Sequence, residues 1–145
     1  MNGPAYWGIA GYPISHSLTP RLFEIVGAEL GLDAQSVYLE ADSMDEFEAN
    51  LENLQGDIWL SCTAPLKHSP QARLAVSGPE GVNAINQLKR INGVWSGTST
   101  DGVGFVAACR HIGVEPNGSI LRMRGGGSAA RAIAAAWAEE GGSII

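Results

Sequence analysis

Cysteine is scarce in this 145-residue chain, which has only Cys62 and Cys109, far apart in the sequence. Two scattered cysteines cannot build a disulfide framework and do not have the spacing of zinc ligands, so we expect a reduced, cytoplasmic protein without a metal site. Basic residues are also few, since nine Lys and Arg against fifteen Asp and Glu give a formal net charge of −6. A nucleic-acid binder needs a basic face to neutralise phosphates, so we expect no nucleic-acid partner.

Long apolar runs are absent as well. No run reaches the roughly 18 residues that a membrane-spanning helix requires, so we expect no membrane partner. The opening MNGPAYWGIAGYP has no basic segment followed by a long apolar one, so we expect no signal peptide. Glycine is plentiful, with 19 residues, and hydrophobic residues make up 45% of the chain. This composition is typical of a globular protein with many tight turns.

Strand-like and helix-like patterns alternate along the chain. Strands are expected at 5–11, 36–41 and 57–62, helices at 19–31, 43–53 and 101–113, and a hairpin at 84–99. The pair Asn92–Gly93 is typical of a hairpin turn. Because helices alternate with strands, we expect an α/β fold with packed layers around a mostly parallel sheet.

Capping residues and apolar faces mark the expected helices. Thr19 and Asp101 are the expected N-caps of the first and third helices, and Ser43 with Glu46 has the spacing of a capping box. Apolar residues recur at helical spacing on the first two helices, at Leu22, Val26 and Leu30 and at Met44, Phe47, Leu51 and Leu54. The segment PLKHSPQARLAV is helix-like or turn-like and is interrupted by Pro70.

The end of the chain has the pattern of a nucleotide-binding domain. Residues 119–145 combine a strand, a glycine-rich turn, an alanine-rich helix and the start of another strand, and Gly125-x-Gly127-x-x-Ala130 fits the dinucleotide fingerprint. The candidate cofactor-binding residues are therefore Gly125, Gly126, Gly127, Ser128 and Ala129. A complete domain of this kind needs on the order of 100 residues. We therefore expect one domain at 1–113 and, at 114–145, a truncated Rossmann domain with only its first strand and helix.

Two motifs place polar side chains beside strand ends. GYPISHSLTP, residues 11–20, puts Ser17 and Thr19 before a helix, where hydroxyls and backbone N–H groups can bind an anion. The alternative is that they only fill a turn and cap the helix. SCTAPLK, residues 61–67, puts Thr63 and Lys67 after a buried strand, where α/β sheets form ligand crevices. Lys67 there could act as a general acid or base, and the alternative is a surface lysine.

Two further polar residues follow the same logic. Asn83 in GVNAIN offers two donors and an acceptor, which suits a polyol ligand. Asp101 in GTSTDGVGF begins a helix, where a carboxylate can cap the helix and also face a crevice. Taken one at a time, each motif is a weak signal of function.

Together and in this order, the motifs resemble those of the shikimate dehydrogenase family. GYPISHSLTP resembles G-x-P-I-x-H-S-x-S-P, SCTAPLK resembles N-V-T-x-P-x-K, and GVNAI resembles G-A-V-N-T. STDGVGF resembles N-T-D-G-x-G, and RGGGSAARAI resembles the G-A-G-G-A-x-R nucleotide turn. The resemblance covers essentially the whole chain.

The resemblance implies an NADP-dependent oxidoreductase of aromatic amino-acid (chorismate) biosynthesis. Such an enzyme interconverts shikimate and 3-dehydroshikimate, with the substrate held by a three-layer N-terminal domain. Carried over by position, Ser17 and Thr19 bind the substrate carboxylate, and Thr63 and Asn83 bind ring hydroxyls. The catalytic pair is then Lys67 and Asp101, both in contact with substrate. A truncated chain of this kind is expected to be inactive alone.

Departures from the family pattern keep other interpretations open. Thr19 replaces a serine and adds a methyl group at the carboxylate end, which could favour quinate, so a quinate/shikimate dehydrogenase is one alternative. A non-catalytic module that binds pathway metabolites is another. Folate-linked dehydrogenases place their lysine in Y-x-x-x-K, whereas Thr63 stands four residues before Lys67 here. The sequence also leaves open NADP against NAD and monomer against homodimer.

Overall fold

The computed structural model describes residues 3–68, 73–76, 78–79 and 81–145. These residues form an α/β fold and group into two compact units. The first unit comprises residues 1–77 with 85–98, and the second comprises 78–84 with 99–145. The helix expected at 101–113 therefore belongs to the second unit. The domain boundary expected after residue 113 stays a prediction.

The first unit contains a five-stranded sheet in the order β2-β1-β3-β4-β5. Its strands are β1 (Tyr6–Gly11), β2 (Gln35–Glu40), β3 (Ile58–Cys62), β4 (Gln87–Ile91) and β5 (Val94–Thr98). β1 runs parallel to both β2 and β3, whereas β4 runs antiparallel to β3 and β5. The sheet is therefore mixed, and the expectation of a mostly parallel sheet holds only for β2-β1-β3. The hairpin β4–β5 adds its two strands in the antiparallel sense.

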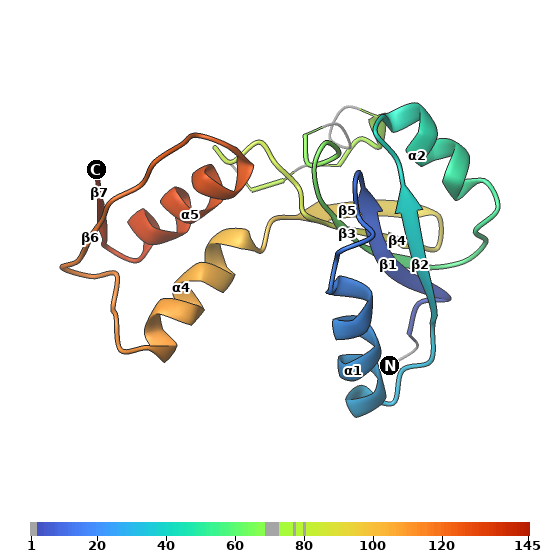
Figure 1. Ribbon diagram of the computed structural model, residues 1–145, viewed down its shortest axis with the longest axis horizontal. Coiled ribbons are helices and arrows are strands. Elements are labelled where there is room, and N and C mark those ends of the chain that lie inside the picture. Colours follow the sequence, from blue (N-terminus) through green and yellow to red (C-terminus); the bar gives the residue numbers. More distant parts are fainter. Residues whose placement is uncertain (1–2, 69–72, 77, 80) are drawn as a thin grey trace. The chain divides into compact units, whose positions relative to one another are not determined.

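Two helices, α1 (Thr19–Leu30) and α2 (Met44–Leu51), cover opposite faces of this sheet. Successive residues of a strand point to opposite faces, and on β1 the buried Trp7 lies under α1 while Ala10 joins the core beneath α2. A Cβ on Gly27 would lie 1.9 Å from the Trp7 ring, so α1 approaches the sheet through a glycine. The Phe23 ring stacks on Trp7 with centroids 5.9 Å apart. Figure 1 shows both helices beside the sheet.

The apolar pattern of α1 was misleading. Leu22, Val26 and Leu30 are 58%, 52% and 66% exposed, because the face of α1 toward the sheet is formed by Pro20, Phe23 and Gly27. The expected stripe on α2 is confirmed, since Met44, Phe47 and Leu51 are buried and Leu54 packs against the same core.

Both helix starts differ slightly from the expected caps. Leu18 occupies the N-cap of α1, so Thr19 is its first helical residue rather than its cap. Ser43 does cap α2, accepting from the Glu46 backbone N–H at 3.4 Å. The Glu46 carboxylate accepts from the Asp42 backbone N–H at 3.0 Å, which completes the box one residue earlier than the usual pattern.

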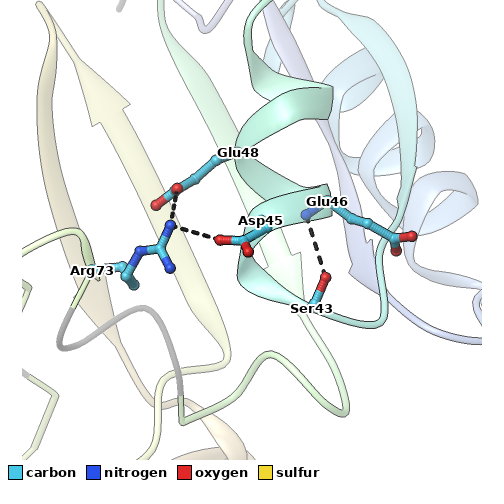
Figure 2. Close-up of polar contacts among 5 residues, drawn as sticks. All are labelled: Ser43, Asp45, Glu46, Glu48 and Arg73. Atoms are coloured by element: carbon cyan, nitrogen blue, oxygen red, sulfur yellow. Dashed lines mark hydrogen bonds and ion pairs between the residues drawn. The ribbon is translucent and has the colours of Figure 1, made fainter.

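An exposed ion-pair cluster links Arg73 to helix α2. Arg73 donates to the Asp45 carboxylate at 2.9 Å and also to Glu48 on the next turn of the helix (Figure 2). Surface pairs of this kind contribute little to stability, because solvent screens them. Pro70, expected to interrupt the segment PLKHSPQARLAV that contains Arg73, lies outside the described residues.

The second unit contains α4 (Asp101–His111), β6 (Ile120–Leu121), α5 (Ser128–Glu139) and β7 (Ser143–Ile144). β6 pairs in parallel with β7, and α5 connects them, which gives the expected strand–turn–helix and the start of the following strand. Helices α4 and α5 lie side by side (Figure 1). Their far ends are joined by Arg110, which donates to Glu140 at 2.6 Å and to Glu115 at 3.0 Å and thereby lowers the pKa of the Glu140 carboxyl.

Candidate functional site

The order β2-β1-β3 creates a topological switch point between β1 and β3. The chain leaves β1 toward β2 by way of α1 on one face, and it reaches β3 by way of α2 on the other. Loops that leave the carboxyl ends of two such strands diverge to opposite faces, and α/β proteins bind ligands in the opening. The loops that follow β1 and β3 here carry the first two motifs, 11–20 and 61–67.

These two loops are joined by backbone hydrogen bonds. The Thr63 N–H donates to the Ala10 carbonyl at 2.9 Å, and the Tyr12 N–H donates to the Ala64 carbonyl at 2.9 Å. Gly11, with φ of +143°, leaves no room for a side chain, because a Cβ there would lie 2.5 Å from Cγ2 of Thr63. The structure therefore brings the first two sequence motifs together at the switch point.

Ser17 and Thr19 lie at the start of α1 with their backbone already organised. The Ser17 hydroxyl accepts from the Thr19 N–H at 3.2 Å, and the Ser17 N–H donates to the Ile14 carbonyl at 2.9 Å. A serine that accepts from the N–H two residues ahead forms a local turn of its own, which explains why Thr19 is not needed as the cap. Both residues are half-buried at the surface of the unit.

Thr63 and Lys67 follow β3 in a turn closed by the Leu66 N–H, which donates to the Thr63 carbonyl at 2.9 Å. Leu66 is buried and anchors the turn in the core. The Lys67 carbonyl accepts from the Ile85 N–H at 2.8 Å, which fixes the backbone from which the half-buried ammonium side chain leaves. Lys67 is therefore held at the carboxyl end of β3, as the sequence predicted.

The Lys67 ammonium acts electrostatically on the last residue of β3. Burial raises the pKa of the Cys62 thiol from 9.0 to about 12, and the charge of Lys67 opposes that shift with a smaller effect. Since the folded pKa lies above the unfolded value, the stabilisation by the neutral thiol is complete below pH 9 and is lost as the pH rises toward 12.

We expect the two cysteines to differ sharply in reactivity. Cys62 is measured in a Cys109→Ala chain and Cys109 in a Cys62→Ala chain, each with a thiol reagent at pH 8. Cys62 should react on the order of a hundredfold more slowly, because it is buried from the reagent and its raised pKa leaves little reactive thiolate. The release of thionitrobenzoate measures both rates, and equal rates would contradict the burial of Cys62. Urea should abolish the difference.

Asn83 belongs to a short loop of the second unit. It is exposed and has φ of +50°, a left-handed conformation that asparagine tolerates better than most residues. Its neighbours Val82 and Ala84 are buried and pack with Ala132 of α5. The loop that carries Asn83 is thus supported by the helix that follows the glycine-rich turn.

Asp101 is the first residue of α4, with Thr100 at the N-cap, so it is not the cap that the sequence suggested. A carboxylate in the first turn still interacts favourably with the helix dipole. Its neighbour Gly102 allows α4 to touch α5, since a Cβ at this position would lie 2.1 Å from the Ala132 carbonyl oxygen. The backbone that carries Asp101 is therefore set by the packing of α4 on α5.

The glycine-rich turn precedes α5, with Gly127 at the N-cap and Ser128 as the first helical residue. Gly125 has φ of +112°, and a Cβ at Gly125, Gly126 or Gly127 would meet nothing within 4 Å. The turn therefore presents open backbone at a helix N-terminus, where the helix dipole and free N–H groups favour a phosphate. These residues fit a dinucleotide pyrophosphate.

The predicted site residues fall into two sets. Ser17, Thr19, Thr63 and Lys67 lie in the first unit, whereas Asn83 and Asp101 lie in the second with the glycine-rich turn. Sequence reasoning assigned no role to Arg131, which donates to two backbone carbonyls of the second unit. Its signal was present, because this arginine is part of the RGGGSAARAI motif.

Within the described ranges, no helix is long and apolar enough to cross a membrane. The same residues contain no group of three or more His, Cys, Asp or Glu side chains that could hold a metal ion.

Comparisons with known proteins find several shikimate dehydrogenases. No family model matches the chain. The chain is 35% identical over 138 residues to the shikimate dehydrogenase (NADP(+)) of Rubrobacter xylanophilus, in a match that covers 89% of this chain and 47% of the relative. The crystal structure of shikimate dehydrogenase from Aquifex aeolicus matches with a TM-score of 0.83 and 27% identity, over 96% of this chain and 53% of that one.

Shikimate 5-dehydrogenase from Thermus thermophilus, solved in complex with shikimate, matches with a TM-score of 0.81 and 25% identity. That match covers 96% of this chain and 54% of the other. The chain therefore spans about half the length of the relatives it matches, although the match extends over nearly all of its own residues.

Proposed function

Because this chain belongs to the shikimate dehydrogenase family, we propose that it supplies the substrate-binding and acid–base residues for the interconversion of shikimate and 3-dehydroshikimate with NADP. It spans about the N-terminal half of its relatives. Binding of the nicotinamide ring and transfer of the hydride would therefore need the part of the relatives that this chain does not match. The observation that carries the proposal is the position of Lys67, fixed at the switch point between β1 and β3.

The first unit would bind the carboxylate end of the substrate. The hydroxyls of Ser17 and Thr19 lie at the N-terminal end of α1, whose dipole favours an anion. Thr63 is fixed beside Gly11 by backbone hydrogen bonds and would contact a ring hydroxyl. A second set of contacts, from Asn83 and Asp101, would come from the second unit.

Lys67 would move the proton. When 3-dehydroshikimate is reduced, the carbonyl carbon accepts a hydride and the Lys67 ammonium gives a proton to the oxygen, which becomes the hydroxyl of shikimate. In the oxidation, the neutral amine takes that proton back while the hydride leaves the carbon. Asp101 would be the second member of the proposed catalytic pair and would act with Lys67 on the same substrate hydroxyl.

The cofactor would bind at the glycine-rich turn. Gly125, Gly126 and Gly127 leave the backbone open there, and Ser128 and Ala129 begin the helix whose N-terminus favours the pyrophosphate. When bound, NADP supplies or accepts the hydride. The same turn would also suit NAD, because the turn contacts only the pyrophosphate that both cofactors share. The residues that distinguish the two cofactors at the ribose follow about 20 residues after the turn in this fold.

We expect the purified chain to bind shikimate reversibly in a calorimetric titration. Binding should weaken at least about tenfold in a Lys67→Met/Asp101→Asn chain, because charge-assisted hydrogen bonds of this kind contribute about 1.5–3 kcal/mol each. A matched control is Lys89→Met, since Lys89 lies over the Trp59 ring of the same unit at 5.2 Å. Its affinity should be unchanged.

The same titration with quinate tests the alternative substrate. Tighter binding of quinate than of shikimate would assign the chain to a quinate/shikimate dehydrogenase and would fit the extra methyl group of Thr19. A folded chain that binds neither acid would refute the proposed substrate class for this polypeptide. Binding that survives the double substitution would instead indicate a module that does not use Lys67 and Asp101.

A further inference from the structure

Arg131 connects two segments to which the proposed function gives different ligands. From the first turns of α5, its Nε donates to the Val82 carbonyl at 3.0 Å, next to Asn83. Its Nη1 donates to the Gly126 carbonyl at 3.1 Å, in the middle of the glycine-rich turn. All these residues belong to the second unit, so one guanidinium joins the substrate loop to the cofactor turn.

Packing next to Arg131 holds the same loop against α5. Val82 and Ala84 are 3% and 2% exposed and form a small buried cluster with Ala132, the residue that follows Arg131. Asn83 lies between the two buried residues in a left-handed conformation, so its side chain direction depends on how they are seated. A shift of Arg131 would therefore change the direction of Asn83.

The chemistry of arginine suits this connection. A guanidinium is planar and presents its N–H groups in a fixed fork. Two carbonyl groups that accept from it are therefore held at a fixed distance and angle to each other, whereas a lysine ammonium imposes no such geometry. Both acceptors are backbone carbonyls. A displacement of the Gly126 peptide when a pyrophosphate binds would therefore be passed to the Val82 peptide through one rigid group.

We propose that Arg131 is a positioning residue that fixes the Asn83 loop to the glycine-rich turn, so that the substrate and cofactor segments respond to each other. The proposal rests on the proposed function for the identity of the two ligands. Coupling between two binding sites is reciprocal, so a substrate that contacts Asn83 must also act on the turn. The effect is measurable with one ligand alone.

The test is a titration of the ¹⁵N-labelled full chain with shikimate, followed by amide chemical shifts. In the unmodified chain we expect shift changes at residues 82–84 and also at 125–127. In Arg131→Met the changes at 125–127 should disappear, and the affinity for shikimate should fall several-fold. Arg131→Lys keeps the charge and should restore only part of the response. Arg122→Met changes an exposed arginine shortly before the turn and should leave the response intact.

Hydrogen exchange separates this proposal from the proposed function. Amide exchange at Asn83 and Ala84 should be about tenfold faster in Arg131→Met than in the unmodified chain, with or without ligand, because local opening becomes easier. If the unmodified chain binds no shikimate, the proposed function fails while the exchange comparison still decides the role of Arg131. Unchanged exchange in a variant that keeps its Trp137 indole signal, or unchanged shifts at 125–127 during binding, would overturn the positioning role.

Discussion

Replacing Gly102 with valine should separate α4 from α5 and destabilise the second unit by about 3 kcal/mol, at the upper end of overpacking penalties. A Cβ at this position would lie 2.1 Å from the Ala132 carbonyl oxygen and 2.9 Å from the Ala136 Cβ. The first of these atoms is backbone, so no rotamer change can relieve the clash. Because Asp101 precedes Gly102 on α4, the substitution should also displace a proposed catalytic residue.

The indole N–H signals in an NMR spectrum measure this effect by unit. Trp137 lies against Phe105 in the second unit, with centroids 6.0 Å apart, whereas the other three tryptophans lie in the first. In Gly102→Val the Trp137 signal should shift or broaden and should be lost at lower urea concentration than before. The signals of Trp7, Trp59 and Trp95 should be unchanged.

Gly104→Ala is the matched control. Gly104 lies on the same helix two residues later, and a Cβ there would meet nothing within 4 Å. Alanine at this position should stabilise α4 by about 0.5–1 kcal/mol, since glycine costs that much in a helix. Gly102→Val as stable as Gly104→Ala would mean that the close approach of α4 and α5 is wrong.

Local sequence signals predicted most of the fold. Asn92 and Gly93 have φ of +50° and +78° and close the β4–β5 hairpin, as an Asn-Gly pair predicts. Ser43 caps α2 through the Glu46 N–H, as the capping spacing predicts. Signals of this kind depend only on neighbouring residues, so they can be recognised without knowledge of the tertiary structure.

Predictions that depended on tertiary packing were less successful. The apolar residues Leu22, Val26 and Leu30 indicated a buried face of α1, but the helix instead approaches Trp7 through Gly27. Helical periodicity shows which residues share one face of a helix, but it does not show which face packs against the sheet. The antiparallel attachment of β4 to β3 likewise depends on contacts between segments that are distant in the sequence.

The sequence predicted individual candidate residues, and these stay predictions, but it did not predict that they lie in two separate compact units. The motifs containing Thr63 and Lys67 lie where the order of the strands predicts a ligand opening. Nothing in the sequence indicated that the loop of Asn83 packs on α5, because the buried cluster joins Val82 and Ala132, which are distant in the sequence. The role of Arg131 was missed for the same reason.

Lys67→Gln should abolish most catalysis while leaving substrate binding nearly intact. The measurement needs a complete enzyme, so residues 1–145 would be joined to the C-terminal half of the Rubrobacter xylanophilus relative. The match to that relative covers 89% of this chain. Loss of a general acid–base group should lower kcat about 10²–10⁴-fold. KM for shikimate should change by less than about tenfold, because glutamine retains a hydrogen-bonding side chain.

The controls distinguish proton transfer from general damage to the first unit. Lys89→Gln removes a lysine of β4 that lies opposite Trp59, near the start of β3 rather than in the turn that follows it, and should leave kcat unchanged. The 145-residue chain without the added half is the blank and should reduce no NADP with shikimate. Because Lys67 is fixed through its own carbonyl and the buried Leu66, glutamine should not disturb the turn. A Lys67→Gln chimera with the kcat of its parent would show that the proton is transferred by another group.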